Sequence, residues 1–273
     1  MTIRLNILDR LDATLGDLDA DLAADPMNAH FDRRIIERVE AIKSRFETAN
    51  EAMYQAARNE IALQGSSATV DRWLRNMSPE TASERPRPGL RLDLLDEIVC
   101  GVLQLREPEE EGRLASPEMV AYQPTPTRHI LDLITASKLS SDDILLDLGS
   151  GLGHVPLVVG ILTGIRTIGV EIQPRHVASA QQAAQRLNLS NVQFVAEDAR
   201  VTDLSTATVF HMFTPFTGSI LTELVHRLHK ESQSRPIRIT SLGPCTHILQ
   251  AQTWLRTNQQ PDTERITAFL SAW

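Results

Sequence analysis

The stretch Asp147-Leu148-Gly149-Ser150-Gly151-Leu152-Gly153-His154 decides how the second half of this chain is interpreted. It ends the apolar run 144–148, which predicts a buried strand, and it precedes the apolar run 156–162, which predicts a helix. Three glycines at alternate positions allow a tight turn and a close approach of the backbone to a ligand. The amino end of the following helix favours a carboxylate or a phosphate. The tract therefore predicts a ligand-binding turn between a strand and a helix.

Strand-like and helix-like segments alternate on both sides of this turn. Further strands are expected at 167–170, 192–195, 208–213 and 237–242, and helices at 127–138, 175–187 and 220–231. This alternation predicts a mostly parallel sheet with helices on both faces. Two strand-like pieces around 258–262 predict a hairpin at the end of the chain. Ligands of such sheets bind beyond the carboxyl ends of the strands, where the strand order reverses.

Carboxylates stand at the ends of the second and third predicted strands. Glu171 follows Gly169-Val170, and a carboxylate there can accept two hydrogen bonds from a ribose diol. Glu197 and Asp198 follow the next strand, where a carboxylate can accept from an exocyclic amine such as that of adenine. The spacing favours Asp198 over its neighbour. A solvated strand-end charge or a helix cap are the alternatives for these acids.

The ordered landmarks DLGSGLGH, GVE and EDA resemble those of class I S-adenosylmethionine-dependent methyltransferases. The resemblance implies a Rossmann-like fold with a mostly parallel seven-stranded sheet and an antiparallel C-terminal strand. It implies S-adenosyl-L-methionine as the cofactor, with the methionine moiety at the glycine turn, the ribose at Glu171 and the adenine at Asp198. The implied cofactor-binding residues are Thr125, Asp147, Gly149, Ser150, Gly151, Gly153, Glu171, Asp198 and Ala199.

A narrower resemblance is to the DOT1-like methyltransferases, which methylate a histone lysine in eukaryotes. That family has a Tyr-Gly-Glu-Thr type loop before a helix and DLGSG, and this chain has the segment 122–125 there. Tyr122 and Thr125 match, whereas Pro124 replaces the glutamate. The Asn-Asn-Phe segment that the family has after its fourth strand is absent here. The resemblance therefore extends to the cofactor loop and not to the substrate.

The segment Thr214-Pro215-Phe216 takes the place of the Asn-Pro-Pro-Tyr motif of amino-group methyltransferases. Threonine offers a hydroxyl where asparagine would offer a carbonyl to an amine. Tyr122, Thr214 and Phe216 are the predicted wall of the acceptor pocket, with a plain strand-to-helix turn as the alternative for residues 214–216. His211 lies next to this segment in the sequence and is a candidate base.

The first 115 residues are predicted to form a helical region, followed by a methyltransferase domain over residues 116–273. Leucines at 8, 11, 15, 18 and 22 form a helical seam, and a second seam runs through a helix expected at 27–63. The two helices predict an antiparallel hairpin that either packs within the protein or forms a homodimer. Shorter helices are expected at 70–76 and 90–105, with a Ser/Pro-rich linker over 78–90.

The composition narrows the class of protein. The chain of 273 residues has 42% hydrophobic and 23% charged residues, which is typical of a globular protein. Its formal net charge of −8 weighs against nucleic acid as the main partner, because phosphate binding needs basic residues. Cys100 and Cys245 match no metal or disulfide spacing, and the acidic N-terminus does not resemble a signal peptide. A cytoplasmic protein with reduced thiols, no metal site and no membrane span is expected.

Three functions are compatible with these patterns. The first is a methyltransferase that acts on an unidentified small molecule or protein side chain. The second is a module that binds S-adenosylmethionine and has lost catalysis. The third is a nicotinamide-dependent oxidoreductase, although its fingerprint would need glycine at position 154, where this chain has histidine.

Overall fold

The structure is a computed structural model that describes residues 29–77, 94–106 and 116–272. The chain divides into two compact units, Met1–Ala57 and Arg58–Trp273. The predicted leucine-seam helix at 8–22 and the linker at 78–90 lie outside the described residues. The described part of the first unit is helical, because helix α2 (Ala29–Gln64) starts there and continues into the second unit.

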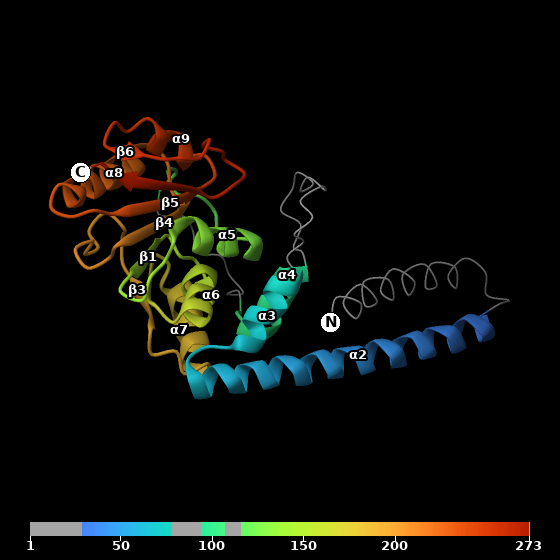
Figure 1. The fold of residues 1–273 in the computed structure, drawn as a ribbon. Helices are drawn as coiled ribbons and strands as arrows, with labels where there is room; N and C mark the ends of the chain where they lie inside the picture. Colours follow the sequence, from blue (N-terminus) through green and yellow to red (C-terminus); the bar gives the residue numbers. More distant parts are fainter. Residues whose placement is uncertain (1–28, 78–93, 107–115, 273) are drawn as a thin grey trace. The chain divides into compact units, whose positions relative to one another are not determined.

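The second unit contains a seven-stranded sheet in the order β3-β2-β1-β4-β5-β7-β6 (Figure 1). The bounds of its strands are β1 Ile144–Leu148, β2 Arg166–Glu171, β3 Val192–Ala196, β4 Val209–Phe213, β5 Arg238–Leu242, β6 Leu255–Arg256 and β7 Thr267–Ser271. The pairs among β1 to β5 are parallel, whereas β7 pairs antiparallel with both β5 and β6. The predicted sheet and its antiparallel C-terminal hairpin are confirmed.

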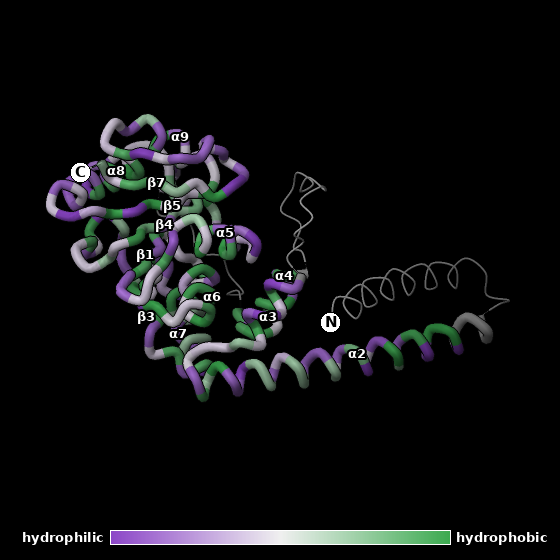
Figure 2. Tube along the Cα trace, in the orientation of Figure 1, coloured by the Kyte–Doolittle hydropathy of each residue, from purple (hydrophilic) through white to green (hydrophobic). Residues whose placement is uncertain are grey.

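Helices alternate with the strands, as the sequence pattern predicts. They are α5 Thr127–Ser137, α6 His154–Thr163, α7 Pro174–Arg186, α8 Gly218–Ser232 and α9 Cys245–Gln250. The residues of α6 from Val155 to Ile161 are all buried, and Figure 2 shows this helix as almost continuously hydrophobic. A helix that is apolar on every side is buried on every side, and α6 packs on β1, β2 and β3 as well as on α3 and α5.

The two short helices before α5 belong to the same compact unit as the sheet. Helix α3 (Ala68–Met77) contacts α6, and α4 (Leu94–Leu103) contacts α3 and α5. The predicted domain boundary after residue 115 stays a prediction. Among the described helices, none combines the length and the hydropathy that a membrane span needs.

A large hydrophobic core cluster lies between the sheet and α8. Leu146 and Leu148 of β1 share it with Phe210 and Met212 of β4, and the buried side of α8 completes it. Alternate residues of these strands and of β2 point to the other face, where the hydroxyl of Thr167 in β2 donates to the carbonyl of Pro156 in α6. Residues of β1 and β2 are thus fixed in register with helices on both faces.

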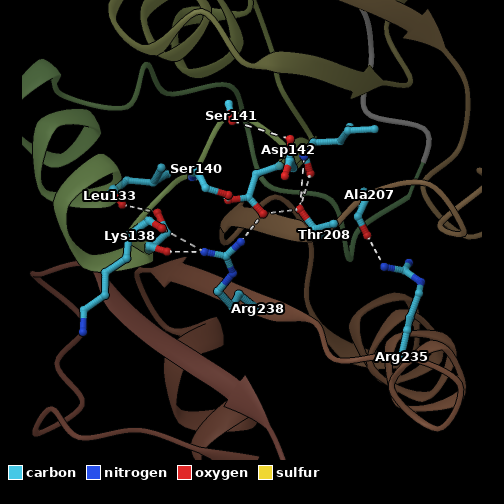
Figure 3. A network of polar contacts seen from close by, with 12 residues as sticks. Leu133, Lys138, Ser140, Ser141, Asp142, Ala207, Thr208, Arg235 and Arg238 are labelled. Carbon is cyan, nitrogen blue, oxygen red and sulfur yellow. Dashed lines mark hydrogen bonds and ion pairs between the residues drawn. The ribbon is translucent and has the colours of Figure 1, made fainter.

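A polar network fastens the amino ends of β1 and β5 (Figure 3). The Arg238 guanidinium pairs with the Asp143 carboxylate and donates to the carbonyls of Ser137, at 2.6 Å, and Lys138. The Thr208 hydroxyl and both donors of Ser140 also donate to Asp143. Burial raises the pKa of Asp143, but these hydrogen bonds, led by Arg238, outweigh burial and hold the pKa at about 2.

Candidate functional site

The strand order reverses between β1 and β4, because the chain runs from β1 outward to β2 and β3 before it returns to β4 on the other side. A cavity of about 390 Å³ opens there, at the carboxyl ends of these strands. Residues that follow β1, β2, β3 and β4 line it together with the segment Met119–Thr125. This is the position at which open α/β sheets bind their ligands.

The glycine turn after β1 forms the floor of the cavity. Gly149, Gly151 and Gly153 have φ angles of +83°, +53° and +85°. Residues other than glycine adopt this region only at a cost in conformational free energy. The Gly149 and Ser150 amides both donate to the Val170 carbonyl, at 2.8 and 2.9 Å. The turn is therefore anchored on β2.

At two of the three glycines, the ring of another residue lies where a Cβ atom would be, and it covers the turn on the cavity side. A Cβ on Gly149 would lie 2.2 Å from Pro215 Cβ, and a Cβ on Gly151 would lie 2.3 Å from Tyr122 Cε2. Gly153 differs, because its missing Cβ makes room for the Phe194 ring at 2.5 Å and it does not line the cavity. Its place is in the packing of the turn against β3.

Glu171 at the end of β2 lines the cavity and holds the glycine turn. Its Oε2 accepts from the Gly151 amide at 2.9 Å, and its Oε1 accepts from the Gln173 amide at 2.8 Å. The carboxylate is 9% exposed, so these two charge-assisted bonds lie largely out of water. Glu171, which is predicted to bind the ribose, thus also links the turn after β1 to the turn after β2.

Asp147 at the end of β1 is 4% exposed and lines the same cavity. Burial, with a further contribution from the charge of Glu171, raises the pKa of Asp147 to about 8. It is costly for two buried, neighbouring carboxyl groups to be charged at the same time, because neither is well solvated and the two charges repel each other. With a pKa of about 8, Asp147 is therefore protonated at neutral pH.

Asp198 also lines the cavity, and Arg200 holds its carboxylate. The Arg200 Nη2 lies 2.6 Å from Asp198 Oδ2, Arg200 Nε lies 3.1 Å from each oxygen, and the Arg200 amide donates to Oδ1. The hydrogen bonds from Arg200 lower the pKa of Asp198 despite partial burial. Ala199, also a predicted cofactor residue, is 8% exposed at the cavity wall.

The segment before α5 closes the opposite side of the cavity. Tyr122 donates to or accepts from His154 Nδ1 at 3.1 Å, and its ring lies 5.1 Å from the ring of His176. Thr125, two residues before α5, is 9% exposed and lines the same wall.

Met119 forms an antiparallel bridge with Phe216, and the Val120 amide donates to the Pro215 carbonyl at 3.1 Å. The predicted acceptor wall is therefore two segments joined side by side.

Thr214 is held in a structural position within that wall. Its φ is +35°, its hydroxyl donates to the Leu242 carbonyl at 3.0 Å, and it accepts from the Cys245 amide at 3.1 Å. Both hydrogen-bonding directions of this hydroxyl thus join the turn after β4 to the turn after β5. Phe216 is 6% exposed and supplies an apolar surface.

The hypothesis that His211 is a base is wrong. His211 is fully buried, does not line the cavity, and pairs with Thr240 Oγ1 through Nδ1 at 3.0 Å. Burial lowers the pKa of His211 to about 3, so it is a neutral residue of the packed interior.

The cavity brings together every predicted site residue except Gly153 and His211, and it adds residues that sequence reasoning missed. His154 and His176 line it, as do Pro215, Phe213 and Pro244. A signal for the two histidines exists in the sequence, because one directly follows the glycine tract and the other lies in the first turn of the helix after Glu171.

One known protein family matches part of the sheet-containing unit. Residues 139–212 match the sequence model of a family described as a methyltransferase domain. This segment contains β1 to β4 almost completely, together with the glycine turn and both strand-end acids. This part of the chain is therefore similar to a methyltransferase domain. No curated protein matches the chain.

Solved structures with a similar fold include an RNA methyltransferase from Salinibacter ruber in complex with S-adenosyl-L-homocysteine. It is 24% identical over 55% of this chain and 92% of its own, with a TM-score of 0.45. The Pyrococcus abyssi tRNA (uracil-54, C5)-methyltransferase in complex with S-adenosyl-L-homocysteine is 17% identical over 55% of this chain and 39% of its own, with a TM-score of 0.41. The mitomycin 7-O-methyltransferase MmcR is 12% identical over 52% of each chain, with a TM-score of 0.41.

Proposed function

We propose that this chain is an S-adenosylmethionine-dependent methyltransferase whose acceptor is an amine of a small molecule or of a protein side chain. The observation that carries the proposal is the cavity in which the glycine turn meets Glu171 at the reversal of strand order. Each part of that arrangement suits one part of the cofactor, and the methyltransferase domain occupies the same residues.

The residues at the cavity suit S-adenosylmethionine in their hydrogen-bonding groups. The turn at Gly149 and Gly151 carries no side chain of its own, and Pro215 and Tyr122 lie over it at the cavity wall. The Ser150 hydroxyl and His176 Nδ1 are buried polar atoms without a hydrogen-bond partner among the described residues, although both residues line the cavity. Buried polar atoms normally have partners, so a polar ligand is the expected one.

In this proposal, the residues at each strand end bind a different part of the cofactor. Glu171 would accept from the ribose hydroxyls, and Asp198, fixed by Arg200, would accept from the adenine amine. The bound cofactor supplies an activated methyl group on a sulfonium. Tyr122, Pro215 and Phe216 restrict water at that end of the cavity, which favours a reaction whose charge disperses.

The charges on the cavity wall argue for the class of acceptor. Four carboxyl groups and neither lysine nor arginine are found among the residues that line it: Asp147, Glu171, Glu197 and Asp198. Because Asp147 is protonated and Asp198 is paired with Arg200, Glu171 and Glu197 supply the net negative charge of this wall, which favours a cationic amine over a phosphate or another polyanion. An amine must lose its proton before it accepts a methyl group, and the apolar surface of Phe216 and Pro215 favours the neutral form.

The finer relationship to the DOT1-like family is part of this proposal. Tyr122 and Thr125, the two residues that match that family's loop, both line the cavity directly before α5. A role for that loop in covering the cofactor is supported by the contact of Tyr122 with Gly151. The acceptor is left open within the amine class, because the segment at 214–216 differs from that family.

Assembly and location are further parts of the proposal. The seam of α2 that faces away from its charged residues includes Phe46 and Met53, which are only half-buried, and a homodimer through this seam is proposed. Light scattering of the full chain tests it.

The two free cysteines, Cys100 and Cys245, are compatible with the reducing cytoplasm, a location that fractionation would test.

The first experiment is calorimetric titration of the purified protein with S-adenosylmethionine and S-adenosylhomocysteine. Glu171→Ala is expected to lose most of the affinity, because it removes both the ribose acceptor and the tie to Gly151. Glu197→Ala is the matched control, since it removes another carboxylate of the same wall. Equal affinities of both variants and the wild type would contradict the assignment of Glu171.

The second experiment asks for turnover. Small amines, lysine-containing peptides and RNA oligonucleotides are offered as acceptors, and formation of S-adenosylhomocysteine is measured. Turnover with an amine is expected. Turnover with the RNA alone would overturn the proposed acceptor class, and tight binding of the cofactor with no acceptor turned over would indicate a binding module.

A further inference from the structure

Helix α5 is held at both ends by side chains of other elements. At its carboxyl end, the Arg238 guanidinium of β5 donates to the carbonyls of its last residue and of the residue after it (Figure 3). At its amino end, the Thr127 amide donates to Oδ1 of Asp96 in α4 at 2.7 Å. The amino end adjoins the cavity, because Thr125, two residues before the helix, lines the cavity wall.

The amino end of α5 has no side-chain cap of its own. The residue before the helix is Pro126, which makes no side-chain hydrogen bond there. The first N–H groups of a helix lack partners within the helix and carry a partial positive charge. The Asp96 carboxylate therefore supplies from α4 the acceptor that α5 lacks. Asp96 is 5% exposed and Thr127 is 1% exposed, so this hydrogen bond lies out of water.

Helix α4 is itself firmly attached, so the Asp96 carboxylate has a fixed position. The buried side of α4 consists of Leu95, Ile98, Val99, Val102 and Leu103. Arg186 of α7 donates to the carbonyls of Leu103, at 3.3 Å, and of the residue after it, at 3.1 Å. Arg58 of α2 donates to the Gly101 carbonyl at 2.6 Å. These contacts prevent α4 from following α5 if the bond between them breaks.

The link between α5 and the cavity wall is short and stiff. Pro124 and Pro126 stand on either side of Thr125. Proline fixes its own φ and restricts the residue before it to an extended backbone. A shift of Thr127 is therefore passed on to Thr125 and Tyr122 and is not absorbed between them.

The segment that receives such a shift fits closely over the glycine turn. A Cβ on Gly151 would lie 2.3 Å from Tyr122 Cε2, and the Tyr122 hydroxyl lies 3.1 Å from His154 Nδ1. Thr125 is 9% exposed in the same wall. A small displacement of this segment therefore changes the cavity beside the turn.

We propose that Asp96 is a positioning residue of the cofactor site. From α4 it fixes the amino end of α5 and, through the two prolines, the segment that covers the glycine turn. Asp96 does not line the cavity, and it lies outside residues 139–212, which match the methyltransferase family. The inference rests on the proposed function, because it takes the cavity as the site of S-adenosylmethionine.

The test is calorimetric titration of Asp96 variants with S-adenosylhomocysteine, at a temperature at which urea unfolding shows each variant to be folded. Asp96→Ala is expected to bind about tenfold more weakly, because the buried Thr127 amide loses its acceptor. Asp96→Asn keeps an oxygen that can accept from this amide, and its affinity is expected to lie close to that of the wild type. If the alanine variant does not fold, Asp96→Glu replaces it: this variant keeps the charge but displaces the carboxylate, and a loss of affinity is expected from it as well.

Arg238→Ala is the matched control, because it releases the other end of the same helix, away from the cavity. It is expected to lower the free energy of unfolding and to leave the affinity for S-adenosylhomocysteine unchanged. If this variant does not fold, Thr208→Val is a milder break of the same network, since the Thr208 hydroxyl donates to Asp143.

The outcomes separate the role of Asp96 from the proposed function. Wild-type affinity of folded Asp96→Ala would overturn that role. An equal loss of affinity in Asp96→Ala and in the control would overturn it as well, because the loss would then follow from lower stability alone. A loss in Asp96→Asn as large as in Asp96→Ala would also contradict it, since the acceptor is retained. A wild-type protein that does not bind S-adenosylhomocysteine would overturn the proposed function, and the role of Asp96 with it.

Discussion

The ring of Tyr122 lies so close to Gly151 that a Cβ on this glycine would be 2.3 Å from Tyr122 Cε2. The glycine turn and its cover are therefore built as one unit. Gly151→Ala is expected to displace Tyr122 and to abolish measurable binding of S-adenosylhomocysteine. It also places alanine at a φ of +53°, which costs about 1–2 kcal/mol of unfolding free energy. Calorimetric titration and urea unfolding measure the two effects separately.

Gly164→Ala is the matched control for this substitution. Gly164 has a φ of +72° at the end of α6, and nothing lies within 4 Å of the position of its missing Cβ. The same backbone cost is expected without a change in cofactor affinity. If both alanine variants lost affinity alike, backbone strain rather than the contact with Tyr122 would explain the result.

The sequence predicts those parts of the site whose positions follow from the order of strands, turns and helices along the chain. The glycine turn follows a strand and precedes a helix within one short stretch, so its position can be inferred without a structure. Glu171 and Asp198 follow in the same way from the alternation of strands and helices. Parallel strands with short connections bring their carboxyl ends to one edge of the sheet.

The missed features depend on contacts between distant segments. Pro215 covers Gly149, and His176 lies beside Tyr122, although neither pair is close in the sequence. No periodicity encodes such contacts, because they arise only when the strand order is known. The six-residue helix α9 was also missed, since one and a half turns leave too few positions for a periodic pattern.

Thr214 is expected to act through structure rather than through chemistry. Its hydroxyl joins the Leu242 carbonyl and the Cys245 amide, so Thr214→Val would leave two backbone groups unpaired and cost about 2 kcal/mol of unfolding free energy. Thr214→Ser keeps the hydroxyl and is expected to be close to the wild type. Urea unfolding distinguishes the two. A valine variant of normal stability that had lost turnover would restore a catalytic role for the hydroxyl.

The buried carboxyl group of Asp147 is expected to make the free energy of unfolding depend on pH. Its pKa is about 8 in the folded protein, whereas the ordinary value is 3.8. Between these values the folded chain retains a proton that the unfolded chain has lost, so stability falls as pH rises, by at most about 1.4 kcal/mol per pH unit from this group. The loss is complete above pH 8. Below pH 3.8 both states are protonated and no penalty remains.

Asp147→Asn isolates this effect, because the amide does not titrate. The difference in unfolding free energy between Asp147→Asn and the wild type is expected to grow from pH 5 to pH 8, in favour of the variant, and then to level off. Urea unfolding at four pH values in this range measures it. A difference that stayed constant across the range would show that Asp147 does not titrate there.

The pair Arg238–Asp143 is expected to be the most costly polar contact to break at the amino ends of the strands. The side chain of Asp143 is 6% exposed and that of Arg238 is 24% exposed. Arg238→Ala would leave a buried carboxylate without its cation, at a cost of about 3–5 kcal/mol in urea unfolding. Arg75→Ala is the control, since Arg75 and Asp71 form a pair on α3 whose side chains are 71% and 32% exposed, and such pairs contribute about 0–1 kcal/mol.

Acid should remove the contribution of Asp143 in a defined window. Its pKa is about 2 in the folded protein against an ordinary value of 3.8, so the stabilisation is present above pH 3.8 and is lost as the pH falls to about 2. Asp143→Asn has no such titration, and its protonated-like amide resembles the acid form of the wild type. The gap in unfolding free energy between wild type and Asp143→Asn should therefore narrow from pH 5 toward pH 2. A gap that persisted at pH 2 would place the effect in packing rather than in the charge of Asp143.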